Sequence, residues 1–175
     1  TFAAGYQPTN DSEQQMACVL SATQENTATE SGGPFGAGVF DTARGELIAL
    51  GVNLVATENL SALHAEMVAI ALAQRKLGTF DLSQANSPLR LVCSTEPCAM
   101  CLGAIPWSGI AEVVTAARDA DARAVGFDEG AKPDDWIDSL ERRGIRVTTD
   151  VMRDRAESLL REYQASAGIL YNPGD

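Results

Sequence analysis

Two short motifs constrain this chain more than any other feature: His64-Ala65-Glu66 and, further along, Pro97-Cys98-Ala99-Met100-Cys101. Together they offer one imidazole, two thiols and one carboxylate. Zinc binds thiolate and neutral imidazole at ~2.0 to 2.3 Å, and a catalytic zinc site has three protein ligands and an open fourth position. We therefore predict that His64, Cys98 and Cys101 bind one zinc ion (Zn2+) and leave a position for water.

The spacing within each motif gives the side chains different roles. Cys98 and Cys101 are three residues apart, which on a helix places both on the same face, and Pro97 is favoured at the first position of a helix. Both thiolates can then reach one ion. Glu66 follows His64 by two residues, so it projects differently from that ligand and can hydrogen-bond zinc-bound water without binding the metal. This is the position of a general acid and base.

A structural zinc site, or no metal at all, is the plainer interpretation of the same residues. Structural zinc sites usually have four protein ligands, whereas this chain contains only one histidine. A structural site would also have no use for Glu66. The residues therefore favour a catalytic zinc centre.

Several stretches resemble the zinc-dependent deaminases of the cytidine deaminase fold, and within that group the chain is most similar to the guanine deaminases. The matching stretches are Gly32-Gly33-Pro34-Phe35-Gly36-Ala37, Gly51-Val52-Asn53, His64-Ala65-Glu66, Pro97-Cys98-Ala99-Met100-Cys101-Leu102-Gly103-Ala104-Ile105, Trp107, and Gly126-Phe127-Asp128-Glu129. The metal motif is shared by deaminases of guanine, cytosine, nucleosides and tRNA adenosine. The Gly-Phe-Asp-Glu stretch is therefore the narrower indication.

The resemblance implies a zinc-dependent hydrolase that converts guanine to xanthine and ammonia. Zinc lowers the pKa of bound water to ~7, and the resulting hydroxide would attack C2 of guanine. Glu66 would carry the proton from water to ring N3 and then to the departing ammonia. Ammeline, an aminotriazine with a similar hydrogen-bonding edge, is an expected side substrate. Deaminases of another small base or nucleoside, such as cytosine, cytidine or ammeline as the physiological substrate, would use the same machinery and stay open as alternatives.

Two polar residues are candidates for recognising the base. Glu129 matches the second acidic residue of the family, which implies a catalytic residue that accepts hydrogen bonds from N1–H and the 2-amino group. Asn53 ends a predicted strand, where a side chain can point into a cleft, and the resemblance gives it a substrate-binding role. The plainer alternatives are a solvated surface position for Glu129 and a hydrogen bond within its own turn for Asn53.

Three aromatic residues are further candidates for substrate binding. Phe35 and Trp107 lie within the matching stretches, and Tyr171 lies in a tail after the last predicted helix. An aromatic wall can stack on a planar base. By default, however, large aromatic side chains such as Phe35 and Trp107 belong to the core.

The charge balance decides between partners. The chain has 13 Lys and Arg against 24 Asp and Glu, a formal charge of −11. Nucleic-acid binders neutralise phosphates with Lys and Arg, so this balance disfavours a tRNA adenosine deaminase. The chain has no run of 18 or more apolar residues and no basic or apolar signal segment at its N-terminus. We expect a soluble cytoplasmic protein that binds a small nucleobase, with no nucleic-acid or membrane partner.

The order of predicted elements indicates the fold class. With 175 residues, 45% of them hydrophobic, the chain has the size of one domain with a sizeable core, so we expect a single domain over residues 1–175. Hydrophobic patterns predict strands at 35–40, 46–52, 89–94, 112–117 and 145–149. Between and around them we predict helices at 12–29, after 61, at 97–106, 119–125, 136–143 and 153–167, and a loop at 54–61.

Alternating strands and helices predict an α/β layered fold with helices on both faces of the sheet. The resemblance adds a three-layer α/β/α, cytidine deaminase-like arrangement with a five-stranded mixed sheet. It also implies a homodimer in which C-terminal elements are exchanged.

Overall fold

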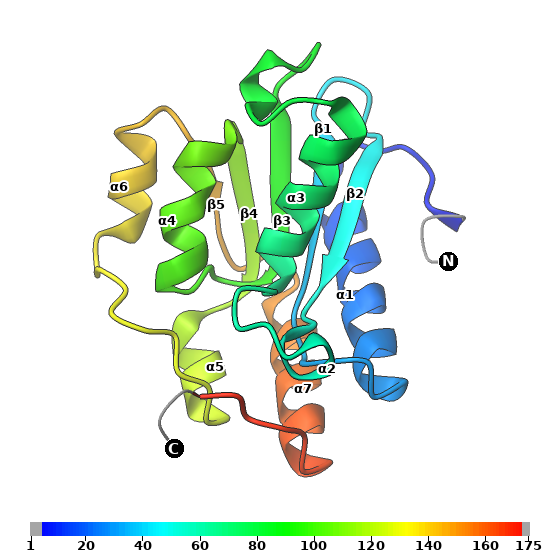
Figure 1. The fold of residues 1–175 in the computed structure, drawn as a ribbon, viewed down its shortest axis with the longest axis vertical. Helices are drawn as coiled ribbons and strands as arrows, with labels where there is room; N and C mark the ends of the chain where they lie inside the picture. Colours follow the sequence, from blue (N-terminus) through cyan, green and yellow to red (C-terminus); the bar gives the residue numbers. More distant parts are fainter. Residues whose placement is uncertain (1–4, 173–175) are drawn as a thin grey trace.

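The computed structural model describes residues 5–172, and this part of the chain forms a five-stranded sheet (Figure 1). The strands are β1 (Gly36–Asp41), β2 (Leu47–Val52), β3 (Leu89–Thr95), β4 (Glu112–Ala117) and β5 (Arg146–Thr148). Their order across the sheet is β2-β1-β3-β4-β5. β1 runs antiparallel to β2 and β3, whereas β4 runs parallel to β3 and β5. The prediction of a five-stranded mixed sheet is confirmed.

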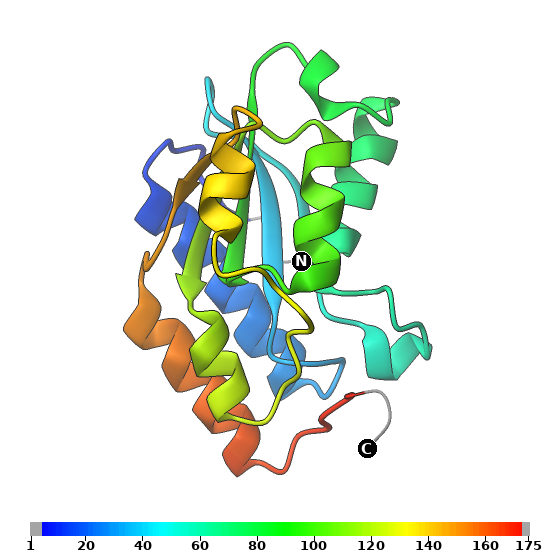
Figure 2. The same ribbon diagram turned by 90° about the vertical axis from the view of Figure 1, so that its left-hand side faces the viewer.

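Helices cover both faces of this sheet (Figures 1 and 2). The helices are α1 (Ser12–Ala28), α2 (Val55–Glu58), α3 (Ala65–Leu77), α4 (Ala99–Ser108), α5 (Asp119–Ala124), α6 (Trp136–Glu141) and α7 (Arg153–Ala165), with a 3-10 turn η2 (Leu82–Gln84). Buried residues of α3, α4 and α6 share one hydrophobic cluster, and those of α1, α5 and α7 share another. The three-layer α/β/α fold is thereby confirmed. Within residues 5–172, every helix is too short or too polar to span a bilayer.

The central strand β3 shows why the sequence forms these layers. Leu91 and Cys93 belong to the cluster on the α3 side, and Val92 belongs to the cluster on the α1 side. Side chains alternate between the two faces of a strand. Because both faces are covered by helices, β3 is an almost continuous apolar segment in the sequence.

One end of the sheet brings distant parts of the sequence together. β1 begins where β2 ends, with Gly36 opposite Val52, and the antiparallel pairing of β1 with β3 places the end of β3 beside the start of β1. Phe35, Asn53 and the turn after β3 therefore lie at the same end of the sheet. α3 and α4 both begin there (Figure 1).

A glycine lets α3 approach the sheet closely enough to reach this end. A Cβ on Gly51 would lie 2.4 Å from the carbonyl oxygen of Ala65 and 2.5 Å from the amide nitrogen of Ala69. Any side chain at residue 51 would push α3 away from β2. Gly51 therefore helps to fix the start of α3 over the sheet.

The structure differs from the sequence-based expectations in three local features. Residues 55–58 form the short helix α2 instead of a loop. α3 begins at Ala65, one residue after His64, whose backbone is still extended. Pro106 lies inside α4, which continues to Ser108 and ends at Gly109 with a left-handed cap. The fixed φ of proline is compatible with helix, so the helix passes residue 106, the predicted end, and stops at the left-handed Gly109.

Candidate active site

The histidine and the two cysteines of the motifs come together between the starts of α3 and α4. The Nδ1 atom of His64 lies 3.4 Å from the Sγ atom of Cys98. The potential ligand atoms of His64, Cys98 and Cys101 all lie within 4.8 Å of one another. Cys98 and Cys101 are buried, and His64 is half-buried. The structure thus brings together the three residues predicted to bind zinc.

Local backbone geometry explains how these side chains meet. His64 is the N-cap of α3 and Cys98 is the N-cap of α4, and neither side chain makes a capping hydrogen bond. Both side chains are therefore free to point into the space between the two helices. The partial positive charge at the helix N-termini stabilises a thiolate there.

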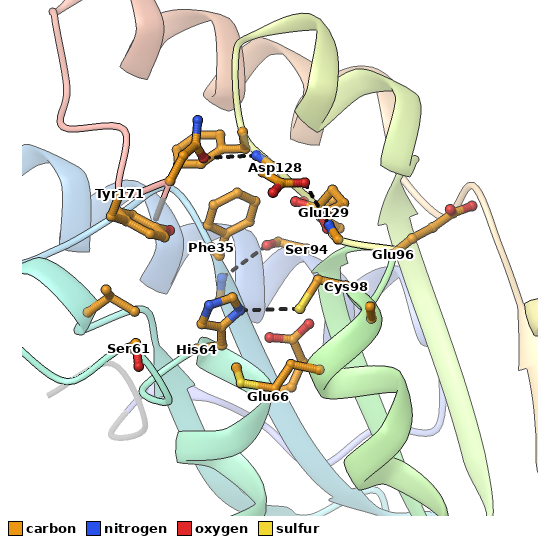
Figure 3. A pocket seen from close by; sticks show the side chains of 18 residues that line it. Phe35, Ser61, His64, Glu66, Ser94, Glu96, Cys98, Asp128, Glu129 and Tyr171 are labelled. Atoms are coloured by element: carbon orange, nitrogen blue, oxygen red, sulfur yellow. Dashed lines mark hydrogen bonds between the residues drawn. The ribbon is translucent and has the colours of Figure 1, made fainter. Parts of the chain in front are cut away.

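Glu66 lies in the first turn of α3 beside this group and is buried (Figure 3). Burial, and next the negative charge on Cys98, raises the pKa of Glu66 to about 7. A carboxyl group with a pKa near neutrality can both accept and donate a proton. Its position, separate from the three ligand atoms, fits an acid and base better than a fourth ligand.

The charges of the cluster fit a divalent cation. The pKa of Cys98 is lowered to about 4, chiefly by a hydrogen bond with the Cys101 thiol. Burial raises this pKa, and the hydrogen bond with His64 lowers it further. The Cys98 thiolate and the carboxyl of Glu66 therefore concentrate negative charge in a buried space. One imidazole and two thiols form the donor set that zinc prefers, and a bound dication would favour the ionised form of every acidic group nearby. The residues present thus fit a zinc ion.

A cavity of about 340 Å³ opens directly above the cluster and is lined by His64, Glu66, Cys98 and Glu129. In the loop after α5, Phe127 and Glu129 are buried while Asp128 is exposed. Glu129 is 6% exposed, and its backbone oxygen accepts a hydrogen bond from the Ala99 amide at 3.0 Å. Burial, and next the charges on Cys98 and Glu66, raises the pKa of Glu129 to about 8. The solvated position considered for Glu129 is excluded.

Aromatic side chains form one wall of this cavity. Phe35 and Tyr171, both predicted from the sequence, line it together with Phe127. The rings of Phe35 and Phe127 meet edge to face at 4.8 Å, and the ring of Tyr171 lies 5.3 Å from Phe127 and 6.3 Å from His64. Tyr171 comes from the tail after α7 and lies across the cavity from Glu129 (Figure 3). Aromatic rings at different tilts thus supply an apolar wall to the cavity that the two carboxyl groups also line.

Asn53 makes the local turn contact considered for it. Its Oδ1 atom accepts a hydrogen bond from the Val55 amide at 3.2 Å. Its Nδ2 atom is buried and has no hydrogen-bond partner in the described part of the chain, although such an unpaired donor is costly. Asn53 is not among the residues that line the cavity, and its substrate-binding role stays a prediction.

Trp107 requires a correction, because the structure does not bring it to the cavity. Its side chain is 86% exposed and is not among the lining residues. Trp107 follows the fully buried Ile105 by two residues, and two residues advance about 200° around a helix. Its side chain therefore leaves α4 on the side opposite the core. Neither the pocket position nor the core alternative holds for Trp107.

Sequence interpretation missed several residues that shape the site. The hydroxyl of Ser94 accepts a hydrogen bond from the Gly36 amide at 3.0 Å and joins β3 to β1 at the cavity. Asn172 accepts from the Asp128 amide at 2.9 Å and donates to the carbonyl of Gly126 at 2.8 Å, which ties the tail to the Glu129 loop. Phe127 lies inside the Gly-Phe-Asp-Glu stretch and could have been chosen from it. No local pattern indicated Ser94 or Asn172.

The fold and site together define a zinc-binding deaminase domain. A model of the cytidine and deoxycytidylate deaminase zinc-binding region matches residues 9–117. The chain belongs to this family.

Named relatives act on more than one substrate. The guanine deaminase of Bacillus subtilis is 44% identical over 98 residues, which are 56% of this chain and 59% of that protein. The tRNA-specific adenosine deaminase of the same organism is 39% identical over 98 residues, 56% of this chain and 58% of that protein. The match thus spans about three fifths of the length of these curated relatives. A solved structure of guanine deaminase from Nitrosomonas europaea is 47% identical, with a TM-score of 0.89, and the match covers 93% of this chain and 90% of that one.

Proposed function

We propose that this protein is a zinc-dependent hydrolase that deaminates free guanine to xanthine and ammonia. The observation that carries the proposal is a pair of buried carboxyl groups lining one cavity: Glu66 beside the metal-binding residues, and Glu129 on the loop after α5 (Figure 3). One can transfer protons while the other reads the base. The similarity to guanine deaminases over nearly the whole chain supports the same substrate.

His64, Cys98 and Cys101 would hold the zinc ion. When bound there, zinc supplies Lewis-acid activation of water at neutral pH. Glu66 accepts the proton that the attacking water releases, because its carboxyl group adjoins the cluster without belonging to the donor set. It then delivers this proton to N3 of guanine. In a second transfer it takes the proton of the hydroxyl group newly bound to C2 and passes it to the 2-amino group, so that the C2=O bond forms as the C2–N bond breaks and ammonia leaves. One carboxyl group thus acts as base and then as acid.

Glu129 supplies the recognition of guanine. Guanine presents two adjacent donors, N1–H and the 2-amino group, and a carboxylate can accept from both. The positive charge of the metal favours the ionised form of Glu129, against the effect of its burial. Asn53 offers its unpaired Nδ2 donor to an acceptor on the base. Phe35 and Tyr171 supply the apolar wall beside which a planar ring packs.

The lining of the cavity also bears on the alternatives. In the described part of the chain, no Lys or Arg lines it, whereas Glu66, Glu96, Asp128 and Glu129 do. A phosphate group has no cationic partner there, and the net charge of −11 opposes a tRNA substrate. Ammeline keeps the donor edge that Glu129 reads and is the expected side substrate. Cytosine and cytidine remain the competing substrates, because they would use the same metal-binding residues.

We also propose that the enzyme is a cytoplasmic homodimer. Trp107, Met100 and Leu72 are exposed apolar side chains on α4 and α3, which lie side by side on one face of the sheet (Figure 2). α4 contains no charged residue, so this face avoids the repulsion that the acidic chain would impose on self-association. Exchange of C-terminal elements between subunits stays a prediction. In the single chain, the C-terminal Tyr171 lines the cavity of its own subunit. Light scattering of wild type and Trp107→Lys tests the dimer: a monomeric wild type would contradict it.

Steady-state turnover of guanine, ammeline, cytosine, cytidine and adenosine by one zinc-loaded sample tests the substrate assignment. We expect guanine to have the highest kcat/KM and ammeline to follow. A preference for cytosine or cytidine would overturn the guanine assignment while leaving the metal site intact.

A further inference from the structure

The loop that carries Glu129 is attached to the metal-binding side of the site at two points. The first is the hydrogen bond from the Ala99 amide, in the first turn of α4, to the backbone oxygen of Glu129. The second is an ion pair between the Nζ atom of Lys132 and the Oε2 atom of Glu96, at 2.8 Å. Glu96 directly precedes Pro97 and Cys98 in the turn after β3. Both attachments therefore join the Glu129 loop to the segment that supplies the thiols.

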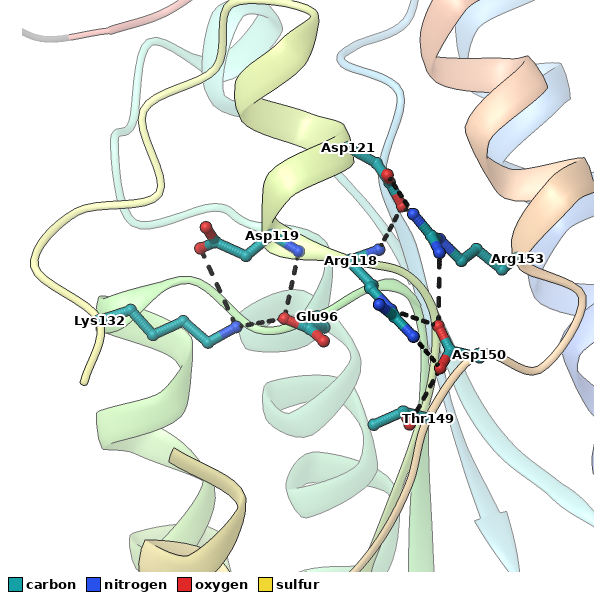
Figure 4. Close-up of polar contacts among 8 residues, drawn as sticks. All are labelled: Glu96, Arg118, Asp119, Asp121, Lys132, Thr149, Asp150 and Arg153. Carbon is teal, nitrogen blue, oxygen red and sulfur yellow. Dashed lines mark hydrogen bonds and ion pairs between the residues drawn. The ribbon is translucent and has the colours of Figure 1, made fainter. Parts of the chain in front are cut away.

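The Lys132 contact is buried, unlike most ion pairs of this protein. The side chain of Lys132 is 5% exposed and that of Glu96 is 12% exposed. The ammonium group also lies 4.4 Å from the centre of the Trp136 ring and 4.0 Å from Asp119, whose amide donates to the same Glu96 oxygen (Figure 4). A buried charge with several fixed partners holds a defined position, whereas an exposed pair does not.

The ion pair lies to one side of the metal-binding residues. Glu96 is among the residues that line the cavity, but its carboxylate points away from His64 and Cys98 (Figure 3). Lys132 is not among the lining residues. The pair is therefore placed to hold the loop that carries Glu129 rather than to contact the reacting groups.

The loop itself is held mainly by hydrogen bonds of its backbone, several of them exposed to solvent. Gly126 and Gly130 both have positive φ angles, and Asp128 is exposed between the buried Phe127 and Glu129. The carbonyl of Gly130 accepts a hydrogen bond from the exposed Arg123. Without the Lys132 contact, no buried ion pair connects this loop to the turn before Cys98 within the described residues.

We propose that Lys132, through its buried ion pair with Glu96, is a positioning residue that fixes the distance between Glu129 and the metal-binding side of the cavity. The inference rests on the proposed function, because the step it serves is the recognition of the base by Glu129. If the substrate is held about 1 Å from its productive position, the rate of the reaction can fall about 100-fold. A lysine suits this place because its ammonium group lies over the Trp136 ring and also reaches Glu96.

The test compares Lys132→Met with wild type and with a matched control. Methionine keeps the length of the stem and removes the charge. Arg142→Met is the control, because it removes an exposed ion pair with Asp135, 3.1 Å long, at the far end of the same segment. We expect Lys132→Met to keep its zinc and to lose about 10- to 100-fold in kcat/KM for guanine, and Arg142→Met to match wild type.

A double-mutant cycle separates positioning from general stability. If Lys132 acts through Glu129, then Lys132→Met should cost less than about threefold in a Glu129→Gln background, because the two losses are not additive. Equal losses in both backgrounds would overturn the proposal. Should Lys132→Met fail to fold, Lys132→Arg and Glu96→Gln, which keep most of the packing, replace it in the same cycle.

Hydrogen exchange supplies a readout that does not depend on turnover. Lys132→Met should accelerate exchange in peptides covering residues 126–131, and at the Ala99 amide, while α1 and α7 stay as protected as in wild type. Unchanged exchange in residues 126–131 would overturn the positioning role. If wild type fails to deaminate guanine, the proposed function fails, and the exchange measurement alone then decides the role of Lys132.

Discussion

The two sides of the cavity are built in different ways. The metal-binding side consists of His64, Glu66, Cys98 and Cys101, within four residues or fewer of one another in each motif and held at the starts of α3 and α4. The other part of the lining includes Glu129 on a loop and, across the cavity from it, Tyr171 on a tail, both from segments far from the two motifs. Regular elements fix the first side, and a few long-range hydrogen bonds and one buried ion pair fix the second.

This difference indicates which part of the site is held rigidly and which part can change its conformation more easily. Helix starts are held by packing against the sheet, as the close contact of Gly51 with Ala65 shows. Loops and tails open at lower cost in free energy because fewer buried contacts hold them. Substitutions on the metal-binding side should therefore abolish the reaction, and substitutions on the loop side should change its selectivity and affinity.

The largest effect is expected from removing a metal ligand. We expect about one zinc per chain in wild type, because one complete set of three ligands is present among residues 5–172. Cys98→Ala should lose most of its zinc and nearly all activity, and a chelator should have the same effect on wild type. Metal analysis checks this, with Cys18→Ala as the control, since Cys18 lies on α1 away from the cluster. Undiminished zinc in Cys98→Ala would refute the ligand assignment.

The next largest effect separates chemistry from metal binding on the same side. Glu66→Gln keeps the size of the side chain but cannot act as a base. We expect its zinc content to equal that of wild type and its kcat to fall by ~10² to 10⁴, the usual contribution of a general acid and base. Parallel metal analysis and steady-state kinetics measure both quantities. Near-normal turnover of Glu66→Gln would contradict the catalytic role of Glu66 and would favour a structural zinc site.

The metal-binding side was predictable because its information is local. The spacing of Cys98 and Cys101, and of His64 and Glu66, sets their directions once a helix start is assumed, and the structure places each N-cap ligand one residue before its helix. The five strands were also predictable, in part because both faces of β3 and β4 are buried and their central residues are apolar. In both cases, residues close together in the sequence carried enough information for the prediction.

The other side was only partly predictable. Glu129 and Tyr171 were chosen with the help of a resemblance, and Trp107 was assigned to the cavity because the resemblance gave no direction for its side chain. The contacts that hold the loop, Lys132 with Glu96 and Asn172 with Asp128, join residues 36 and 44 positions apart. No local pattern encodes such pairs, since they depend on how the sheet brings chain ends together.

A moderate effect is expected at Glu129, and it tests selectivity. Glu129→Gln removes the charge and leaves one acceptor, so its amide can turn a donor toward the donors of guanine, at a cost of about 1 to 3 kcal/mol. We expect kcat/KM for guanine to fall at least tenfold, because ~1.4 kcal/mol is a factor of ten. Zinc content and thermal stability should stay close to those of wild type.

Cytosine supplies the comparison for this variant, because it lacks the adjacent pair of donors. Its kcat/KM should fall less than that of guanine when both are measured with wild type and Glu129→Gln. Equal losses for the two bases would show that Glu129 does not read the edge of guanine.

The smallest effect is expected at the tail, where Asn172→Ala removes the two hydrogen bonds to Asp128 and Gly126. Each such bond contributes about 0.5 to 1.5 kcal/mol, and partial exposure of Asn172 places the loss at the lower end. Tyr171 would then leave the aromatic wall more often, so the KM for guanine should rise about three- to tenfold while kcat changes less than twofold. Ser166→Ala is the matched control, because it removes one exposed hydrogen bond to Tyr163 just before the tail. Steady-state kinetics and metal analysis of both variants test this expectation. A fall in kcat or in zinc content for Asn172→Ala would mean that the tail also supports the metal-binding side. The two sides of the cavity would then not be independent.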